Sequence, residues 1–385
     1  MNKLIILGAS GSIGSQSLEI LKEYKSLNYE LIGFSVGTKV EKIDKIIEEF
    51  PSVKYVYALD ENKCESLKAK YPNISFFFGE FGMEEMIKKA KPKSVLNALV
   101  GFAGVIPSLT ALENHADLYL ANKESLVVAG ELINDILAKH KSKLFPIDSE
   151  HVAIEKCLVG HDKSEVKKII LTCSGGPFIT RKWEELEEVT LEEALNHPTW
   201  KMGNKITIDS ATLINKVFEI VEAHYLFDVK SKDIEVLIHK ESLIHSLIQL
   251  IDGSYLCDIG IADMKNPILY ALANNKRLNF DHELDIFSLT NLTFIPLSKD
   301  RAALLNLGKL IIDQGGNTGA IVNAANDVAV AAFLDNKIKF SSIYTLIFNA
   351  LNSSKFIEKP TINDIVITNY NVKNLVIKMI EKGDC

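Results

Sequence analysis

Asp148, Glu150 and Glu219 are the first residues in this chain whose types and spacing could do chemistry. Asp148 and Glu150 flank one serine directly after the apolar run "LFPI", and Glu219 follows in "SATLINKVFEIVEAHYLF". Two acids held so close repel each other, so a partly buried pair needs a cation or a shared proton. Three carboxylates with no cysteine or histidine cluster beside them would suit a hard ion such as Mg²⁺ or Mn²⁺.

The acid pair also has an ordinary structural interpretation. On an extended strand end, Asp148 and Glu150 project to the same side, while Ser149 points away unless the chain turns. Alternatively, Asp148 or Ser149 caps a helix that starts near Glu150, where an acid is favoured in the first turn.

The segment 210–227 predicts a helix that opens near Ser210. Asn215, Lys216 and Glu219 lie three or four residues apart on it and can share one face. Such a face is either part of a polar site or an exposed lysine–glutamate pair of little energetic value.

A glycine-rich stretch at the start, "LIILGASGSIG", places Gly8, Gly11 and Gly14 between an apolar strand and an amphipathic helix. This pattern is a variant of the dinucleotide-binding fingerprint, in which main-chain N–H groups bind a pyrophosphate. A tight strand-to-helix turn is the alternative. The next strand ends in "SVGTKV", without the acid that would bind an NAD ribose, and Thr38 and Lys39 favour NADP instead.

Two polar loops complete the candidate chemistry. "TCSGGPF" ends a strand at Ser174 with two glycines, which suits a main-chain nest around an anion. "NHPTWKMGNK" combines His197 with Trp200, Met202 and Gly203, as expected for a lid that excludes water from a ligand. Anchoring of the loop in the core by Trp200 is the alternative.

The elements that must position these residues follow a clear order. Strand and helix patterns alternate up to Pro146, which predicts a Rossmann-like, doubly wound parallel sheet. Longer β-rich runs and then helical periodicity predict a central α+β domain with a partly antiparallel sheet and a C-terminal helical domain. The expected division is a nucleotide-binding domain, a catalytic and metal-binding domain, a linker and the helical domain, at residues 1–147, 148–276, 277–295 and 296–385.

Composition excludes several classes of function. The 385 residues are 47% hydrophobic and 24% charged with a net charge of −7, so nothing favours a nucleic-acid partner. No apolar run reaches the length of a membrane span. The five cysteines lack a C-x-x-C spacing, which argues against disulfides and thiolate zinc sites. We therefore expect a cytoplasmic protein with no membrane partner.

Taken together, six motifs and the C-terminal "NAANDVAVAAF" resemble the 1-deoxy-D-xylulose 5-phosphate reductoisomerase family over nearly the whole chain. The six motifs are "GASGSIG", "ANKESLV", "PIDSEH", "SGGPF", "HPTWKMG" and "IDSATLINKVFEIVEAH". The resemblance implies conversion of 1-deoxy-D-xylulose 5-phosphate to 2-C-methyl-D-erythritol 4-phosphate by a carbon shift and a reduction with NADPH. It also implies a homodimer.

The resemblance implies a role for each matching residue. Asp148, Glu150 and Glu219 would hold the divalent metal and, with Lys123 and His197, form the catalytic set. The substrate phosphate would be bound by Ser174, Ser210, Asn215 and Lys216 with His197 nearby, and the sugar by Ser149 and Lys123. Glu150 and Glu219 would contact the substrate as well as the metal. The cofactor contacts would be Ser10, Gly11, Ser12, Ile13, Gly37, Thr38, Lys39, Asn122, Glu124 and Gly203, and the lid Trp200 and Met202. After Gly37 the chain has Thr-Lys where members commonly have Lys-Asn, so we expect a different contact to the 2′-phosphate and a less secure preference for NADP.

Two other functions fit part of the pattern. An NADP-dependent oxidoreductase acting on a semialdehyde or homoserine would turn over without metal. A non-catalytic sensor of NADPH would not need the three acids to converge.

Overall fold

The structure is a computed structural model that describes residues 1–179, 181–200 and 202–383. The chain divides into two compact units. The first consists of Met1–Ser125, Leu132–Asp148 and Asp263–Asn279, and the second of Leu126–Glu131, Ser149–Ala262 and Phe280–Cys385. These units are defined by contacts within the chain and do not test the predicted functional domains, which stay a prediction.

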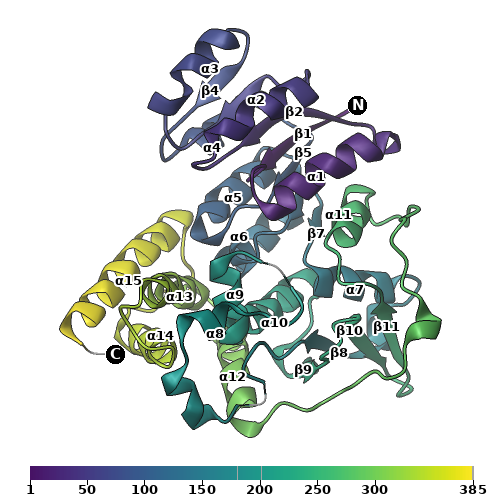
Figure 1. Cartoon of the computed structure of the whole chain (residues 1–385), viewed down its shortest axis with the longest axis vertical. Coiled ribbons are helices and arrows are strands. Elements are labelled where there is room, and N and C mark those ends of the chain that lie inside the picture. Colours follow the sequence, from purple (N-terminus) through teal and green to yellow (C-terminus); the bar gives the residue numbers. More distant parts are fainter. Residues whose placement is uncertain (180, 201, 384–385) are drawn as a thin grey trace. The chain divides into compact units, whose positions relative to one another are not determined.

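A parallel sheet forms the centre of the first unit. Seven strands of the described chain pair in the order β4-β3-β2-β1-β5-β6-β7 (Figure 1). Their bounds are β1 (Asn2–Leu7), β2 (Tyr29–Ser35), β3 (Tyr55–Tyr57), β4 (Ser75–Phe77), β5 (Ser94–Asn97), β6 (Asp117–Leu120) and β7 (Leu144–Pro146). The strand order reverses direction beside β1, which is where doubly wound sheets bind ligands. The predicted Rossmann-like sheet is confirmed.

Helices connect these strands and cover the sheet. They are α1 (Ser12–Glu23), α2 (Ile43–Glu49), α3 (Glu65–Lys70), α4 (Gly82–Ala90), α5 (Val105–Glu113), α6 (Glu124–Lys139) and, much later in the chain, α11 (Lys265–Leu272). α11 packs against α1, and Lys265 pairs with Glu19 at 2.8 Å. Residues 4–7 of β1 are apolar and buried, because helices shield a parallel sheet on both faces.

A second sheet lies in the second unit, with strand order β11-β10-β8-β9. Its strands are β8 (Val166–Cys173), β9 (Ile234–Ile238), β10 (Ile244–Leu250) and β11 (Tyr255–Ile259). β8 and β9 are parallel, and the other pairs are antiparallel, as the sequence predicts. The helices around it are α7 (Ser149–Leu158), α8 (Leu191–Leu195), α9 (Asn204–Ala211) and α10 (Ile214–Phe227).

Two local predictions are wrong. The segment 210–227 is not one helix opening near Ser210, because α9 ends at Ala211 and Leu213 adopts a left-handed φ of 61° before α10 begins. The acid pair does not lie on an extended strand, because β7 ends at Pro146 and α7 already begins at Ser149. The alternative, a helix that starts at the acid pair, is correct.

Four helices close the second unit: α12 (Lys299–Gln314), α13 (Thr318–Leu334), α14 (Ser342–Ser353) and α15 (Ile362–Lys382). α13 packs against α14, α15 and α9. A Cβ on Gly319 would meet the carbonyl oxygen of Val127 at 1.8 Å, so the small residues of α13 permit the close approach that the sequence predicts. No helix in the described ranges is both long and apolar enough to cross a membrane.

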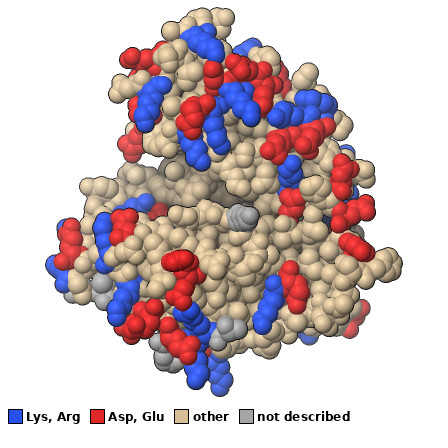
Figure 2. Space-filling view, in the orientation of Figure 1, with Lys and Arg blue, Asp and Glu red and all other residues tan. Residues whose placement is uncertain are grey.

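Short 3₁₀ helices punctuate both units, at Lys25–Leu27, Val40–Lys42, Asn62–Cys64, Gly101–Gly104, Lys163–Glu165, Trp183–Glu188, Ser231–Asp233 and Ile286–Ser288. On the face drawn in Figure 2, basic and acidic side chains are interspersed rather than gathered by sign. Exposed ion pairs such as Lys70 with Asp44, at 2.7 Å, place opposite charges side by side.

Candidate active site

The three acids that the sequence singles out converge. Asp148 directly precedes α7, Glu150 lies in the first turn of that helix, and Glu219 lies on α10, which packs against α7. One carboxylate oxygen from each lies within 4.8 Å of the others. Glu219 is 1% exposed and therefore does not point to solvent. Three hard oxygen donors at this spacing fit Mg²⁺ or Mn²⁺.

Buried cations balance these acids. The Lys216 ammonium forms an ion pair with Glu219, lies 3.7 Å from Oε1 of Glu150 and donates to the carbonyl of Thr172 at 2.6 Å. Burial lowers the pKa of Lys216, but Glu219 and Glu150 raise it further, so the net pKa is above its usual value and the ammonium stays charged. Lys123 likewise pairs with Asp148 at 2.8 Å. The alternative of an exposed surface pair is wrong, since Lys216 and Glu219 are both buried.

Neutral side chains orient the carboxylates. Asn215 donates to Oε1 of Glu219 at 2.5 Å, and Ser149 donates to Oε2 of Glu150 at 2.5 Å. Asn215, Lys216 and Glu219 therefore share one face of α10, as their spacing predicts. Because each acid keeps a protein partner, its carboxylate has a defined direction before any ligand arrives.

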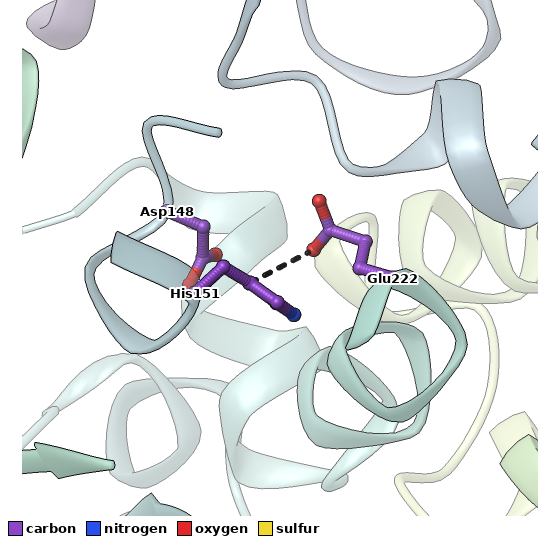
Figure 3. A group of neighbouring side chains, drawn as sticks. All are labelled: Asp148, His151 and Glu222. Atoms are coloured by element: carbon purple, nitrogen blue, oxygen red, sulfur yellow. Dashed lines mark ion pairs between the residues drawn. The ribbon is translucent and has the colours of Figure 1, made fainter. Parts of the chain in front are cut away.

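A second acidic group shares Asp148, and sequence reasoning missed it. Figure 3 shows Asp148 beside His151 of α7 and Glu222 of α10. Nδ1 of the fully buried His151 lies 3.8 Å from Oε2 of Glu222, and its Nε2 lies 3.0 Å from the main-chain oxygen of Glu219. The available signal was helical spacing, because His151 and Glu222 each follow a predicted ligand by three residues. Through these two contacts His151 connects α7 to the turn of α10 that carries Glu219.

The loop after β8 brings two predicted anion ligands together. Gly175 and Gly176 have left-handed φ values of 86° and 67°, and the Gly176 N–H donates to Oγ of Ser174 at 3.2 Å. A Cβ on Gly176 would meet the main-chain oxygen of Ser210 at 3.1 Å. The Ser174 loop therefore packs directly on the last turn of α9.

His197 presents one N–H to this loop. Its Nδ1 accepts the main-chain N–H groups of Thr199 and Trp200 at 3.2 and 3.0 Å, so the proton of the neutral ring is on Nε2. Nε2 lies 3.3 Å from Oγ of Ser174. Burial lowers the pKa of His197, which favours this neutral form.

The predicted lid residues flank Lys201, which lies outside the described residues. Trp200 and Met202 are both half-buried. The Trp200 ring lies 6.3 Å from the ring of His245 in the same unit, centroid to centroid. Gly203, a predicted cofactor contact, is the exposed N-cap of α9.

The glycine-rich loop of the first unit is built from main chain. Gly8 has a φ of 79°, and its N–H donates to Oγ of Ser35 at 2.8 Å. A Cβ on Gly14 would meet the carbonyl oxygen of Gly8 at 2.3 Å, so only glycine permits this turn. Within the described chain no side chain caps α1 after its N-cap Gly11, and the predicted contacts at residues 10–13 surround this helix end. Such an end attracts an anionic group.

The other predicted cofactor residues differ in exposure. Gly37, Thr38 and Lys39 are exposed just beyond β2. Sequence reasoning missed a nearby cation, Lys42, whose ammonium donates to the carbonyl of Ser10 at 3.0 Å.

Asn122 and Glu124 are buried and make contacts within the protein. The Asn122 amide donates to Oε2 of Glu124 at 3.0 Å, and Oε1 of Glu124 accepts the N–H of Gly101 at 2.9 Å. Their side chains therefore hold the loop at Gly101, and a contact from Asn122 to a cofactor would come from its main chain.

Comparisons with known proteins agree over the whole chain. Family models described as "1-deoxy-D-xylulose 5-phosphate reductoisomerase", the C-terminal domain of that enzyme and "DXP reductoisomerase C-terminal domain" match residues 4–130, 144–227 and 259–375. The reductoisomerase of Thermoanaerobacter pseudethanolicus is 42% identical over 98% of this chain and 99% of the relative. That of Bacillus cereus is 38% identical over 99% and 100%.

Solved structures are similar as well. A DOX-P reductoisomerase in complex with NADPH, fosmidomycin and magnesium has a TM-score of 0.90 and 34% identity, covering 99% of this chain and 98% of its own. The 1-deoxy-D-xylulose 5-phosphate reductoisomerase from Zymomonas mobilis in complex with NADPH has a TM-score of 0.89 and 34% identity, covering 99% of each chain.

Proposed function

The chain belongs to the 1-deoxy-D-xylulose 5-phosphate reductoisomerase family, and from this premise we propose its reaction. It converts 1-deoxy-D-xylulose 5-phosphate to 2-C-methyl-D-erythritol 4-phosphate, a precursor of isoprenoids, with NADPH and a divalent metal ion. The observation that carries the proposal is the convergence of Asp148, Glu150 and Glu219 within 4.8 Å. Neither a metal-free oxidoreductase nor an NADPH sensor has a use for that arrangement.

When bound, the metal supplies a Lewis acid for the substrate oxygens and NADPH supplies the hydride. Asp148, Glu150 and Glu219 would hold the metal. Lys216 and Lys123 offset the repulsion among the acids, because each pairs with a carboxylate of the set. Ser149 and Lys123 would contact the sugar.

The substrate phosphate would be bound where the Ser174 loop meets α9 and α10. Ser174, Ser210 and Asn215 offer neutral hydrogen-bond donors, His197 offers Nε2–H, and Lys216 offers a positive charge. Because the chain carries a net charge of −7, this positive charge must be local. The reaction would break one carbon–carbon bond of the substrate and form another. A bound phosphate group would keep the two resulting fragments of the substrate oriented for recombination.

The cofactor would be bound by the first unit. Ser10, Gly11, Ser12 and Ile13 would hold its pyrophosphate at the start of α1. Gly37, Thr38 and Lys39, together with Lys42, would receive the 2′-phosphate, and Asn122, Glu124 and Gly203 are further proposed contacts. Trp200 and Met202 would form a lid that excludes water.

We also propose a homodimer in the cytoplasm, by resemblance to the family. Light scattering during size-exclusion chromatography measures the mass in solution. A mass of one chain, 42.8 kDa, at the working concentration would contradict the dimer.

The experiment that tests the reaction follows NADPH absorbance with 1-deoxy-D-xylulose 5-phosphate present. We expect absorbance to fall only with both substrate and metal, to stop after chelation and to return when Mg²⁺ or Mn²⁺ is added back. A metal-free oxidoreductase would be unaffected by the chelator. A sensor would bind NADPH without consuming it, and either result from folded protein would overturn the proposal.

A further inference from the structure

We propose that the C-terminal helices position the substrate-phosphate site. One buried polar side chain from each of α12, α13 and α14 contacts a segment that carries a predicted phosphate ligand. The three side chains are Arg301, Asn326 and Tyr344. The inference rests on the proposed function, because it concerns the same phosphate site.

Arg301 of α12 holds the Ser174 loop. Its guanidinium donates to the carbonyl oxygens of Phe178, of Ile179 at 2.8 Å and of Arg181 at 3.1 Å. Arg301 is 8% exposed and forms no ion pair with a described carboxylate. A buried cation satisfied only by carbonyl groups is costly, so apolar packing would have stabilised the fold more simply. Its rigid, planar set of donors does define the path of the loop.

Asn326 of α13 holds the last turn of α9. Its amide donates to Oδ1 of Asp209 at 2.8 Å, and both side chains are buried. Asp209 directly precedes the predicted phosphate ligand Ser210. Oδ2 of Asp209 accepts from Lys205, which also pairs with Asp327 of α13 at 3.5 Å. Asn326 and Asp327 of α13 therefore fix how α9 is rotated about its axis and where it lies along that axis.

Tyr344 of α14 holds the break between α9 and α10. Its hydroxyl donates to the main-chain oxygen of Thr212, next to the left-handed Leu213. The break decides where α10 begins, and the first turn of α10 carries Asn215 and Lys216. Tyr344 is buried, and burial raises the pKa of its hydroxyl, so it remains a donor at neutral pH.

The distribution of these contacts indicates a positioning role. Each one reaches a different segment of a single site, and each ends within a few residues of a predicted phosphate ligand. The hydrogen bond of Tyr344 is neutral and adds little net stability, whereas the contacts of Arg301 and Asn326 involve charged groups and support both the fold and the geometry of the site. Arg301, Asn326 and Tyr344 are positioning residues that act through the segments they hold.

The test compares Asn326→Leu with Asn323→Leu. Asn323 lies one turn earlier on α13, is equally buried, and its side-chain amide has no hydrogen-bond partner among the described residues. We expect Asn326→Leu to raise KM for the phosphosugar about tenfold, because it removes a bond to a charged group. KM for NADPH should stay within twofold, kcat should change by less than about threefold, and Asn323→Leu should leave all three unchanged.

Inorganic phosphate serves as a direct probe of the site. As a competitive inhibitor, it should bind Asn326→Leu more weakly by a factor similar to the rise in KM. In a Ser210→Ala background, Asn326→Leu should have less than a twofold further effect, because the two residues act through one contact. If Asn326→Leu fails to fold, Tyr344→Phe takes its place, because it removes one hydroxyl without changing the packing. We expect Tyr344→Phe to raise KM for the phosphosugar about threefold.

Three outcomes separate this inference from the function it rests on. If Ser210→Ala raises KM for the phosphosugar but Asn326→Leu and Tyr344→Phe do not, the C-terminal helices do not position the site. The same conclusion follows if Asn326→Leu affects NADPH and the phosphosugar equally. If Ser210→Ala itself leaves KM unchanged, the assignment of the phosphate site fails, and the inference fails with it.

Discussion

The two candidate anion sites are built in different ways. In the first unit the glycine loop is one continuous stretch, residues 8–14, whose main chain forms the site. In the second unit the candidate phosphate site is assembled from side chains on α9, α10 and the loop after β8. A main-chain site is specified by local sequence, whereas a side-chain site depends on how distant segments pack.

The two sites also carry different electrostatic costs. The N-terminus of α1 offers main-chain N–H groups, which carry only partial charges. The second unit buries Glu219 and Lys216 as an ion pair, and this is stable only while both partners are present. Substitutions should therefore act through charge in the second unit and through steric fit in the first.

The largest effect is expected for Lys216→Met. Removing one partner of a buried ion pair leaves the acids uncompensated and should lower the free energy of unfolding by about 3–5 kcal/mol. Denaturant unfolding measures this change. Mg²⁺ at about 100 times its dissociation constant should restore about 2.7 kcal/mol, and a chelator should remove that gain. Lys339→Met, which breaks an exposed pair with Glu187, is the control and should leave the free energy of unfolding nearly unchanged.

Glu219→Gln and Glu222→Gln distinguish the two acidic groups around Asp148. The changes are matched, because both glutamates lie on α10 and each is 1% exposed. Glu219→Gln should lower kcat/KM by more than about 100-fold, and Glu222→Gln by about tenfold, as for a residue that supports a metal ligand. Steady-state kinetics at several Mg²⁺ concentrations measures both. A greater loss in Glu222→Gln would place the metal with His151 instead.

A steric prediction concerns the first unit. Gly14→Ala should lower stability by about 1–3 kcal/mol, because its Cβ would meet main-chain atoms at 2.3 and 2.6 Å that cannot move freely. Gly11→Ala should cost less than about 1 kcal/mol, since its nearest contact would be 3.3 Å. Thermal unfolding without cofactor compares the two variants. Equal losses of stability in the two variants would show that a side chain at residue 14 does not clash with the loop.

The smallest effect concerns pH and His197. Burial lowers its folded pKa below the ordinary value of 6.5, so the unfolded chain binds the proton first as the pH falls. The resulting stability is present above about pH 6.5 and is lost below it, until the folded pKa is reached. His197→Asn should make the fall in unfolding free energy between pH 7.5 and 5.5 less steep. His282→Asn replaces an exposed histidine, and an equal change in that variant would rule out His197 as the source.

Local sequence predicted the parallel sheet, the partly antiparallel second sheet and the helical C-terminus, because each depends on periodicity within one segment. It failed where a single residue overrides that periodicity. Leu213 takes a left-handed φ inside a run that otherwise has helical spacing, and this moves Ser210 from the start of one helix to the end of another. The buried Thr212, bonded to Tyr344 of α14, shows that a tertiary contact accompanies this break.

The sequence by itself determined the chemistry available to this protein: three acids suited to a hard ion, a glycine loop suited to a pyrophosphate, and the face that Asn215, Lys216 and Glu219 share. These depend on residue type and on spacing within a few turns. Only the tertiary structure decided that Glu219 meets Asp148 and Glu150, and that His151, Arg301, Asn326 and Tyr344 support the site. The reason is physical, because contacts between distant segments depend on how complete side chains pack, and no local pattern records that packing.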